Sequence, residues 1–279
     1  MNVIPIRTRY LKPNEGYELL VNSIVNNKID NGDFIVISET PISTIEGNLV
    51  DESKYETSLS SIVIAEIWCK LIWGYILCPI LGYSKRTTTN LRRMPKQARN
   101  HKEFILREYG LKHALQPTAE AGVDLSNVPG NYVSLLPENP LNSAKTIKKL
   151  VYEKSQIDVE VIIIDTDPTY LIRKTLFTTL PKSVKGIKND TGIYGYILRA
   201  FGKKIGATPL ASTINLDIPE LIELANIAET SQRENSTDFF ETIYNMKELF
   251  DVECSEVSIE MLDKITHIPA ILIKKDNYL

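Results

Sequence analysis

The chain of 279 residues contains few cysteines and histidines and lacks the signatures of several large enzyme classes. Its three cysteines, Cys69, Cys78 and Cys254, are widely spaced and form no C-x-x-C pair, which argues against a disulfide framework and a zinc ribbon. Its three histidines are scattered without metal-ligand spacing. No G-x-x-x-x-G-K-[ST], G-x-G-x-x-G or H-E-x-x-H motif occurs, so P-loop, Rossmann and zincin sites are not expected.

The sequence also lacks a strong excess of charge of either sign. Its formal net charge is -3, and hydrophobic residues make up 43% and charged residues 24%, which is typical of a folded globular protein. We therefore do not expect nucleic acid as a partner. Met1 to Arg7 contain no basic region leading into an apolar one, so we expect no signal peptide. Together with the unpaired cysteine pattern, this predicts a cytoplasmic protein.

One apolar segment, Ile62 to Tyr83, is long enough to span a bilayer. Glu66 and Lys70 interrupt it at the four-residue spacing of a helical ion pair. Gly74, Pro79 and Gly82 interrupt its second half. We interpret the segment as a buried or oligomer-forming helix and expect no membrane partner, with membrane attachment as the alternative.

A basic run follows this segment. Seven Lys and Arg residues with no acidic residue among them lie between positions 85 and 102: Lys85, Arg86, Arg92, Arg93, Lys96, Arg99 and Lys102. Such a run either binds an anionic partner or forms a solvated basic surface, and the sequence leaves both open.

The apolar periodicity predicts an α/β protein with a mixed α+β character, organised as one unit over residues 1–279, with a bilobed arrangement left open. The expected elements are strands at Phe34 to Ile37, Tyr132 to Leu136 and Val159 to Ile164, and a helix from Ala144 to Lys154 capped by Ser143. The last three form a strand-helix-strand unit that ends at Asp165. We therefore expect Asp165 at the carboxyl end of a strand, where open α/β sheets place their ligands.

The later part of the chain has further expected elements. Asp217 is the expected cap of a helix from Ile218 to about Glu229. We also expect a polar loop from Ser231 to Thr237, a helix from Asp238 to Phe250 and a strand from Pro269 to Lys275.

The segment Ala121 to Asn127 is the best candidate loop. Asp124, Ser126 and Asn127 place a carboxylate, a hydroxyl and a carboxamide within four residues, and oxygen ligands of this kind suit a hard cation and phosphate. A turn in which Asp124 accepts hydrogen bonds from its own backbone explains the same residues. The second acidic cluster, Asp165 to Asp167, favours a metal site.

Several motifs occur in an order that resembles the coenzyme F-420-0:L-glutamate ligase (γ-glutamyl ligase) family. They are Gly32-Asp33-x-Ile35-Val36-Ile37, Ile42-Ser43-x-x-Glu46-Gly47, Ala121-Gly122-Val123-Asp124-x-Ser126-Asn127, Leu135-Leu136-Pro137-Glu138-x-Pro140 and Ile163-Ile164-Asp165-Thr166. The resemblance extends from about Gly16 to Thr166 and is faint in residues 57–105, which hold the aromatic helix and the basic run.

The resemblance implies a mixed sheet with flanking helices, a homodimer, and a GTP-dependent amide ligase that adds L-glutamate to a phosphorylated deazaflavin carboxylate with Mn²⁺ or Mg²⁺. By position, Asp124 and Asp165 would bind one metal and Thr166 a second. Asn127, Thr40 and Thr44 would contact the nucleotide, which is the co-substrate. The small-molecule acceptor is not specified by these residues.

The chain departs from the family pattern at three places. Thr44 replaces a lysine that contacts the nucleotide, Asp167 to Arg173 replace a Phe-Gly-Arg-Pro segment, and Ser231 to Ser236 replace a glycine-containing nucleotide loop. Two hypotheses follow. The first is an active ligase, and the second is an inactive or repurposed relative that acts as a metal-binding, nucleotide-binding or regulatory subunit.

Overall fold

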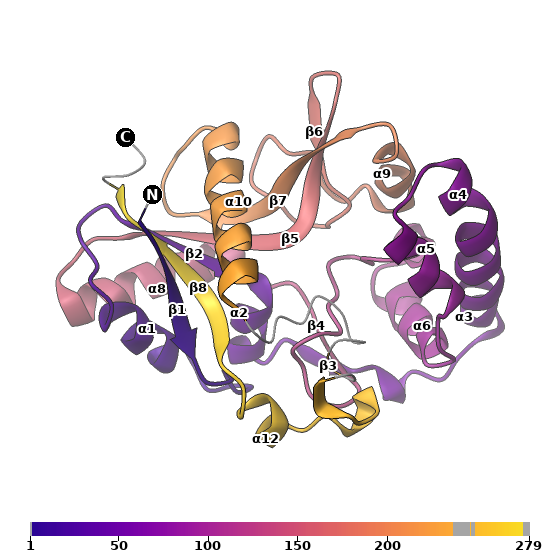
Figure 1. The fold of residues 1–279 in the computed structure, drawn as a ribbon, viewed down its shortest axis with the longest axis horizontal. Coiled ribbons are helices and arrows are strands. Elements are labelled where there is room, and N and C mark those ends of the chain that lie inside the picture. Colours follow the sequence, from indigo (N-terminus) through magenta and orange to yellow (C-terminus); the bar gives the residue numbers. More distant parts are fainter. Residues whose placement is uncertain (1, 237–245, 247–248, 276–279) are drawn as a thin grey trace. The chain divides into compact units, whose positions relative to one another are not determined.

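The computed structural model describes residues 2–236, 246 and 249–275, and these residues form two compact units. Unit 1 comprises residues 1–50, 124–168 and 206–279, and unit 2 comprises residues 51–123 and 169–205. The chain combines a mixed β-sheet with flanking helices, as the sequence predicts (Figure 1).

The sheet of unit 1 is built from strands that are distant in the sequence. Its order is β1-β8-β2-β5, where β1 is Val3–Thr8, β8 is His267–Ile273, β2 is Phe34–Ser38 and β5 is Glu160–Ile172. β8 is antiparallel to both of its neighbours, and β2 is parallel to β5. β5 also pairs with β7, Lys203–Ser212. The aliphatic runs of β2, β5 and β8 are almost completely buried, as expected for strands covered on both faces.

Helices cover this sheet. The orange α10, Ile218–Asn235, crosses in front of it in Figure 1 and packs against β1, β2 and β8. Other helices of this unit are α1 (Glu18–Val25), α2 (Glu39–Glu46), α8 (Pro140–Ser155), the 3₁₀ turn η3 (Cys254–Glu256) and α12 (Ile259–Leu262). The short β3, Leu49–Asp51, and β4, Tyr132–Ser134, form a separate two-stranded sheet.

Three expectations about these elements are wrong. β4 belongs to the small sheet, so β4, α8 and β5 are not a parallel crossover unit. β5 does not stop at Asp165 but continues to Ile172. The N-cap of α8 is Asn139 instead of Ser143, since its Oδ1 accepts a hydrogen bond from the Asn142 N–H at 3.1 Å and proline follows it at the first helical position.

The later elements also differ in length from the expectations. α10 begins after Asp217 as expected but extends to Asn235, so the predicted loop from Ser231 is helical up to that residue. The strand expected from Pro269 to Lys275 is β8. A helix expected from Asp238 to Phe250 lies mostly outside the described residues.

Unit 2 is mainly helical. Its elements are the 3₁₀ turn η1 (Glu52–Lys54), α3 (Leu59–Ile62), the π-helix η2 (Val63–Leu77), α4 (Cys78–Ile80), α5 (Lys85–Arg92), α6 (Ala98–Glu108), α7 (Leu111–Ala114), β6 (Thr175–Phe177) and α9 (Gly192–Leu198). β6 pairs antiparallel with the last residues of β5.

The apolar segment forms one continuous helix from Leu59 to Ile80 across α3, η2 and α4, long and apolar enough to span a membrane by length and composition alone. The expected Glu66 and Lys70 pair is present at 3.7 Å. Contrary to expectation, Gly74 does not interrupt the helix. Its inner residues Cys69, Trp73 and Cys78 are completely buried, as the interpretation of a core helix requires.

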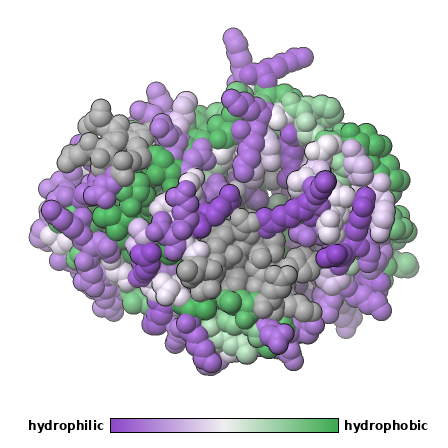
Figure 2. Space-filling model, in the orientation of Figure 1, coloured by the Kyte–Doolittle hydropathy of each residue, from purple (hydrophilic) through white to green (hydrophobic). Residues whose placement is uncertain are grey.

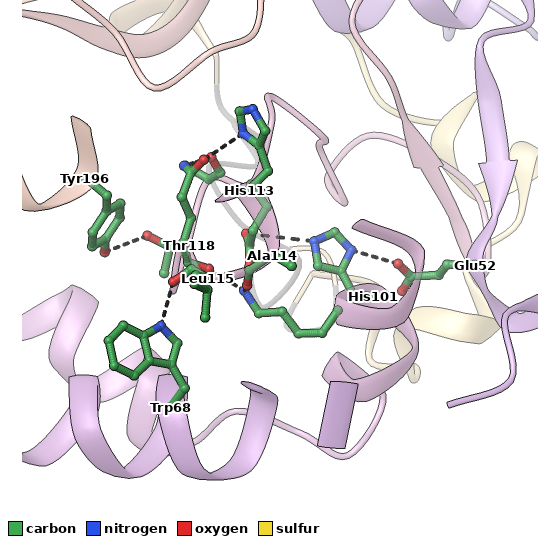
Figure 3. A network of polar contacts seen from close by, with 12 residues as sticks. Glu52, Trp68, His101, His113, Ala114, Leu115, Thr118 and Tyr196 are labelled. Atoms are coloured by element: carbon green, nitrogen blue, oxygen red, sulfur yellow. Dashed lines mark hydrogen bonds and ion pairs between the residues drawn. The ribbon is translucent and has the colours of Figure 1, made fainter. Parts of the chain in front are cut away.

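A buried polar network holds the centre of unit 2 together (Figure 3). The ammonium of Lys102 is completely buried, forms an ion pair with Glu120 and donates hydrogen bonds to the carbonyls of Ala114, at 3.1 Å, and Gln116. His101 Nδ1 lies 2.8 Å from Glu52, and its Nε2 lies 3.8 Å from Glu120.

The same network extends to the helices around it. Trp68 donates from its indole nitrogen to the Leu115 carbonyl at 2.7 Å, and the hydroxyls of Thr118 and Tyr196 lie 3.0 Å apart (Figure 3). The loop between α7 and residue 120 is therefore fixed by side chains from several elements of unit 2.

The basic run divides into two groups. Arg99 is paired with Glu66 at 2.9 Å, and Lys102 is buried in the network. The other five members, Lys85, Arg86, Arg92, Arg93 and Lys96, are exposed. Most of the run therefore forms a solvent-facing basic surface on α5 and the turn that follows it.

Candidate functional site

The candidate site lies in unit 1, where the parallel pairing of β2 with β5 ends. The last paired residues are Ser38 and Ile164, and Asp165 follows directly. Asp165 is buried, and its Oδ1 accepts a hydrogen bond from the Asp167 N–H at 2.7 Å. The sequence placed Asp165 at a strand end, and the structure places it at the end of the parallel ladder, although the strand itself continues.

Asp124 reaches the site from the candidate loop. A pair of backbone hydrogen bonds with Ser134 fixes its main chain, at 2.8 and 2.9 Å. The N–H of Ser126 donates to Asp124 Oδ1 at 2.9 Å, and the Ser126 hydroxyl lies 2.9 Å from Oδ2. This is the self-capped turn that the sequence offers as the alternative to a site. It also orients the half-buried Asp124 carboxylate.

Glu39 is a member of the site that the sequence analysis missed. It is the first residue of α2, directly after β2, and its side chain is only 8% exposed. Its Oε1 lies 2.8 Å from the Thr40 hydroxyl. Its buried Oε2 has no hydrogen-bond partner among the described residues. The available signal was a carboxylate directly after a strand that is almost completely buried.

Thr40 lies between two of these carboxylates. Its hydroxyl is 2.8 Å from Glu39 Oε1 and 3.3 Å from Asp124 Oδ2. Because a hydroxyl carries one hydrogen, it can donate to only one of them at a time. The Thr40 hydroxyl therefore cannot satisfy both carboxylates at once.

The pKa shifts in the cluster all have the same sign. Burial, followed by the charge of Asp124, raises the pKa of Glu39 to about 8. Burial, with Glu39 and Asp167 next, raises the pKa of Asp165 well above its usual value. Burial also raises the pKa of Asp124, against the lowering effect of the Ser126 hydrogen bonds. The carboxylates therefore repel one another, and no leading contribution comes from a neighbouring cation.

This donor set has the chemistry of a site for a hard divalent cation, since carboxylate and hydroxyl oxygens are the ligands that Mg²⁺ and Mn²⁺ prefer. Within the described residues, no three Asp, Glu, His or Cys side chains converge closely enough to hold a metal ion. The chemistry of these residues fits a cation, because one Glu39 oxygen lacks a hydrogen-bond partner and a cation would reduce the mutual repulsion of the carboxylates. Binding would require these side chains to draw together.

The other predicted site residues lie as follows. Thr166 is exposed and points to the strand face opposite Asp165, because side chains alternate along β5. The side-chain amide of Asn127 donates to the Ser126 hydroxyl at 3.3 Å, next to Asp124. Thr44 is buried and donates to the Thr40 carbonyl at 2.9 Å within α2. The structure thus brings together Thr40, Asp124 and Asp165 but leaves Thr166 and Thr44 out of this cluster.

Comparison with known proteins provides the family. An uncharacterized protein of Methanocaldococcus jannaschii is 37% identical over the whole chain and 98% of its own length. The coenzyme F420:L-glutamate ligase of Methanopyrus kandleri is 29% identical over 58% of each chain, and that of M. jannaschii is 33% identical over 51% of each. The chain therefore spans only about half to three-fifths of the ligases that it matches. Residues 5–237 match the F420-0:Gamma-glutamyl ligase family, and the chain belongs to that family.

Proposed function

We propose that this chain is a metal-dependent amide ligase, driven by a nucleoside triphosphate, that adds L-glutamate to a carboxylate of a phosphorylated deazaflavin. Family membership and the similarity to coenzyme F420:L-glutamate ligases support the reaction class. The observation that carries the proposal is the cluster of the buried Glu39 and Asp165 with the half-buried Asp124, which holds like charges together with no cation among the leading contributions to their pKa values.

In the proposed reaction, the acceptor carboxylate attacks the γ-phosphorus of GTP, and GDP leaves. The glutamate amine then attacks the carbonyl carbon of the acyl phosphate, phosphate leaves, and the nitrogen loses a proton. A bound Mn²⁺ or Mg²⁺ would offset the charge of the triphosphate and of the transferring oxygens.

The residues of this chain would then have distinct tasks. Asp124 and Asp165 would hold the cation, with Glu39 as an additional ligand. The Ser126 N–H and hydroxyl would keep the Asp124 carboxylate in place. Asn127 and Thr40 would contact the nucleotide beside it, whereas Thr166, on the opposite face of β5, would need a second cation there. Thr44 would need to give up its bond to the Thr40 carbonyl before it could contact phosphate.

The test is turnover. The full chain with Mn²⁺, GTP, L-glutamate and coenzyme F420-0 should release GDP and phosphate in step with a product heavier by one glutamyl group, measured by mass spectrometry. Asp165→Asn should abolish product, while the exposed Asp158→Asn in the same unit should leave it unchanged. A folded wild-type protein that forms no product contradicts the proposal.

The second candidate is a metal-binding relative without ligase activity. Thr44 stands at the position of the family's nucleotide lysine, and its buried hydroxyl is bonded within α2. Furthermore, M. jannaschii has both a ligase and the uncharacterized relative, and only the latter matches this chain over its whole length. Calorimetry separates the two candidates, since heat from Mn²⁺ with none from GTP, together with no turnover, is expected only for the inactive relative.

A further inference from the structure

The helix from Leu59 to Ile80 in unit 2 leaves a continuous apolar stripe exposed to solvent. Seven apolar or aromatic side chains form it, each between 46% and 73% exposed: Leu59, Val63, Ile67, Leu71, Tyr75, Ile76 and Ile80. Figure 2 shows hydrophobic surface along the edge where Figure 1 places α3 and α4. A contiguous exposed apolar patch commonly marks a binding surface.

The π-helical geometry explains why the stripe is straight. The N–H of Cys78 donates to the carbonyl of Trp73, five residues earlier, as in a π-helix. Because each turn is wider than an α-helical turn, side chains four to five residues apart line up along one face. The buried stripe of Ala65, Cys69, Trp73 and Cys78 follows the same spacing on the opposite side. Among the described residues, the helix therefore has one face packed in unit 2 and one face exposed to solvent.

Basic side chains border this stripe. The guanidinium of Arg92, from α5, lies 4.7 Å from the centre of the Tyr75 ring, and its Nε donates to the Gly74 carbonyl at 2.8 Å. This fixes α5 beside the stripe. Arg93 and Lys96 continue the exposed basic surface from there. The acidic residue of the helix, Glu66, is neutralised by Arg99 and Lys70.

We propose that this surface docks on an anionic lipid membrane. An exposed apolar face that carries an aromatic residue and is flanked by Lys and Arg suits the interface of a negatively charged bilayer, in which the apolar face enters the headgroup region and the cations attract the lipids. The helix would lie on the membrane and not cross it, because its inner face is buried against unit 2. The positive charge of α5 complements anionic lipid. It disfavours a second copy of this chain as the partner, because the stripe of that copy would be bordered by the same cations.

The test uses the full chain and sedimentation with lipid vesicles. The protein should sediment with phosphatidylcholine vesicles that contain phosphatidylglycerol, should sediment much less with phosphatidylcholine alone, and should be released by high salt. Ile67→Glu with Leu71→Glu should abolish binding. The matched control is Leu141→Glu, which changes an exposed apolar residue of α8 in unit 1 and should leave binding unchanged.

A charge variant keeps the proposal testable if the apolar variant fails to fold, which the fluorescence of Trp68 and Trp73 would reveal. Each basic residue near an anionic surface contributes about fivefold to partitioning, so Arg93→Gln with Lys96→Gln should weaken vesicle binding about 25-fold. Lys145→Gln with Lys149→Gln, on α8, should not. Equal vesicle binding by the wild type and by the Arg93 and Lys96 variant would overturn the proposal. A wild-type protein that does not bind vesicles, and that instead forms a dimer which Ile67→Glu with Leu71→Glu dissociates, would also overturn it.

Discussion

The two units bury charged side chains in opposite ways. In unit 2, the buried Glu120 faces Lys102 and His101; burial raises its pKa, but these two cations lower it to about 2. In unit 1, the buried Glu39 faces other carboxylates, and its pKa is raised to about 8. Glu120 and Glu39 are similarly buried, so the charges of their neighbours decide whether the pKa is lowered or raised. An internally neutralised network is structural, whereas a cluster of like charges is what the proposed cation site requires.

The test with the largest expected effect removes the buried Lys102 ammonium of unit 2. Lys102→Met leaves Glu120 buried without its ion-pair partner, and we expect a loss of about 3 to 5 kcal/mol in the free energy of unfolding. Urea denaturation followed by tryptophan fluorescence measures this loss, because both tryptophans lie in η2. The double variant Lys102→Met with Glu120→Gln should recover part of it. A loss below about 1 kcal/mol would mean that the network is not structural.

The next test supplies a cation to unit 1. Mn²⁺ at a hundredfold excess over its dissociation constant should stabilise the protein by about 2.7 kcal/mol, seen as a higher melting temperature by circular dichroism and reversed by chelation. Asp124→Asn should remove this stabilisation, and Asp158→Asn should keep it. A melting temperature that Mn²⁺ does not change would contradict the proposed metal site.

Removing one of the like charges should stabilise the metal-free protein. The pKa of Glu39 in the folded state lies above its unfolded value, so the stability of the wild type falls as pH rises from about 4.5 to about 8. Glu39→Gln should be more stable at pH values above this window, by on the order of 2 kcal/mol, and should show no advantage below it. The exposed Glu153→Gln is the control. Denaturation curves at pH values below and above this window measure the difference. A Glu39→Gln variant that is less stable than the wild type above the window would contradict the repulsion among these carboxylates.

The smallest expected effect concerns His101 in unit 2. Burial lowers its pKa, but the charge of Glu52, the nearby Glu120 and the hydrogen bond with Glu52 raise it to about 9. Its contribution is therefore fully present below its unfolded pKa near 6.5 and is lost as pH rises through about 9. We expect a change on the order of 1 kcal/mol across that window, absent in His101→Gln. Equal pH dependence in both proteins would assign the effect to other groups.

The sequence predicted those parts of the fold that are determined by local apolar patterns. β2 and the first half of β5 are continuous aliphatic runs, and Asp217 before Ile218 is a recognisable helix start. The continuation of β5 could not be predicted, because Asp165 to Pro168 have the composition of a turn. The pairing of β4 with β3 also depends on contacts that local pattern does not encode.

The same limit applies to the candidate site. Asp124 and Asp165 were found because they lie in recognisable motifs, and the structure brings them into one electrostatic cluster. Glu39 was missed because its importance comes from three-dimensional neighbours, namely Thr40 and the distant carboxylates. Thr166 was assigned to a second metal by the family resemblance, and because adjacent side chains of an extended strand point to opposite faces, it does not lie beside Asp165.

The position of β8 has a consequence for biosynthesis. This strand, residues 267–273, lies between β1 and β2 in the sheet, and it lies beyond the family match that ends at residue 237. On the ribosome, both segments of unit 2 emerge before β8 has been translated. The edges of β1 and β2 that pair with β8 therefore stay unpaired until residues 267–273 have left the ribosome. Nascent chains stalled before residue 267 should accordingly be the species most prone to aggregate.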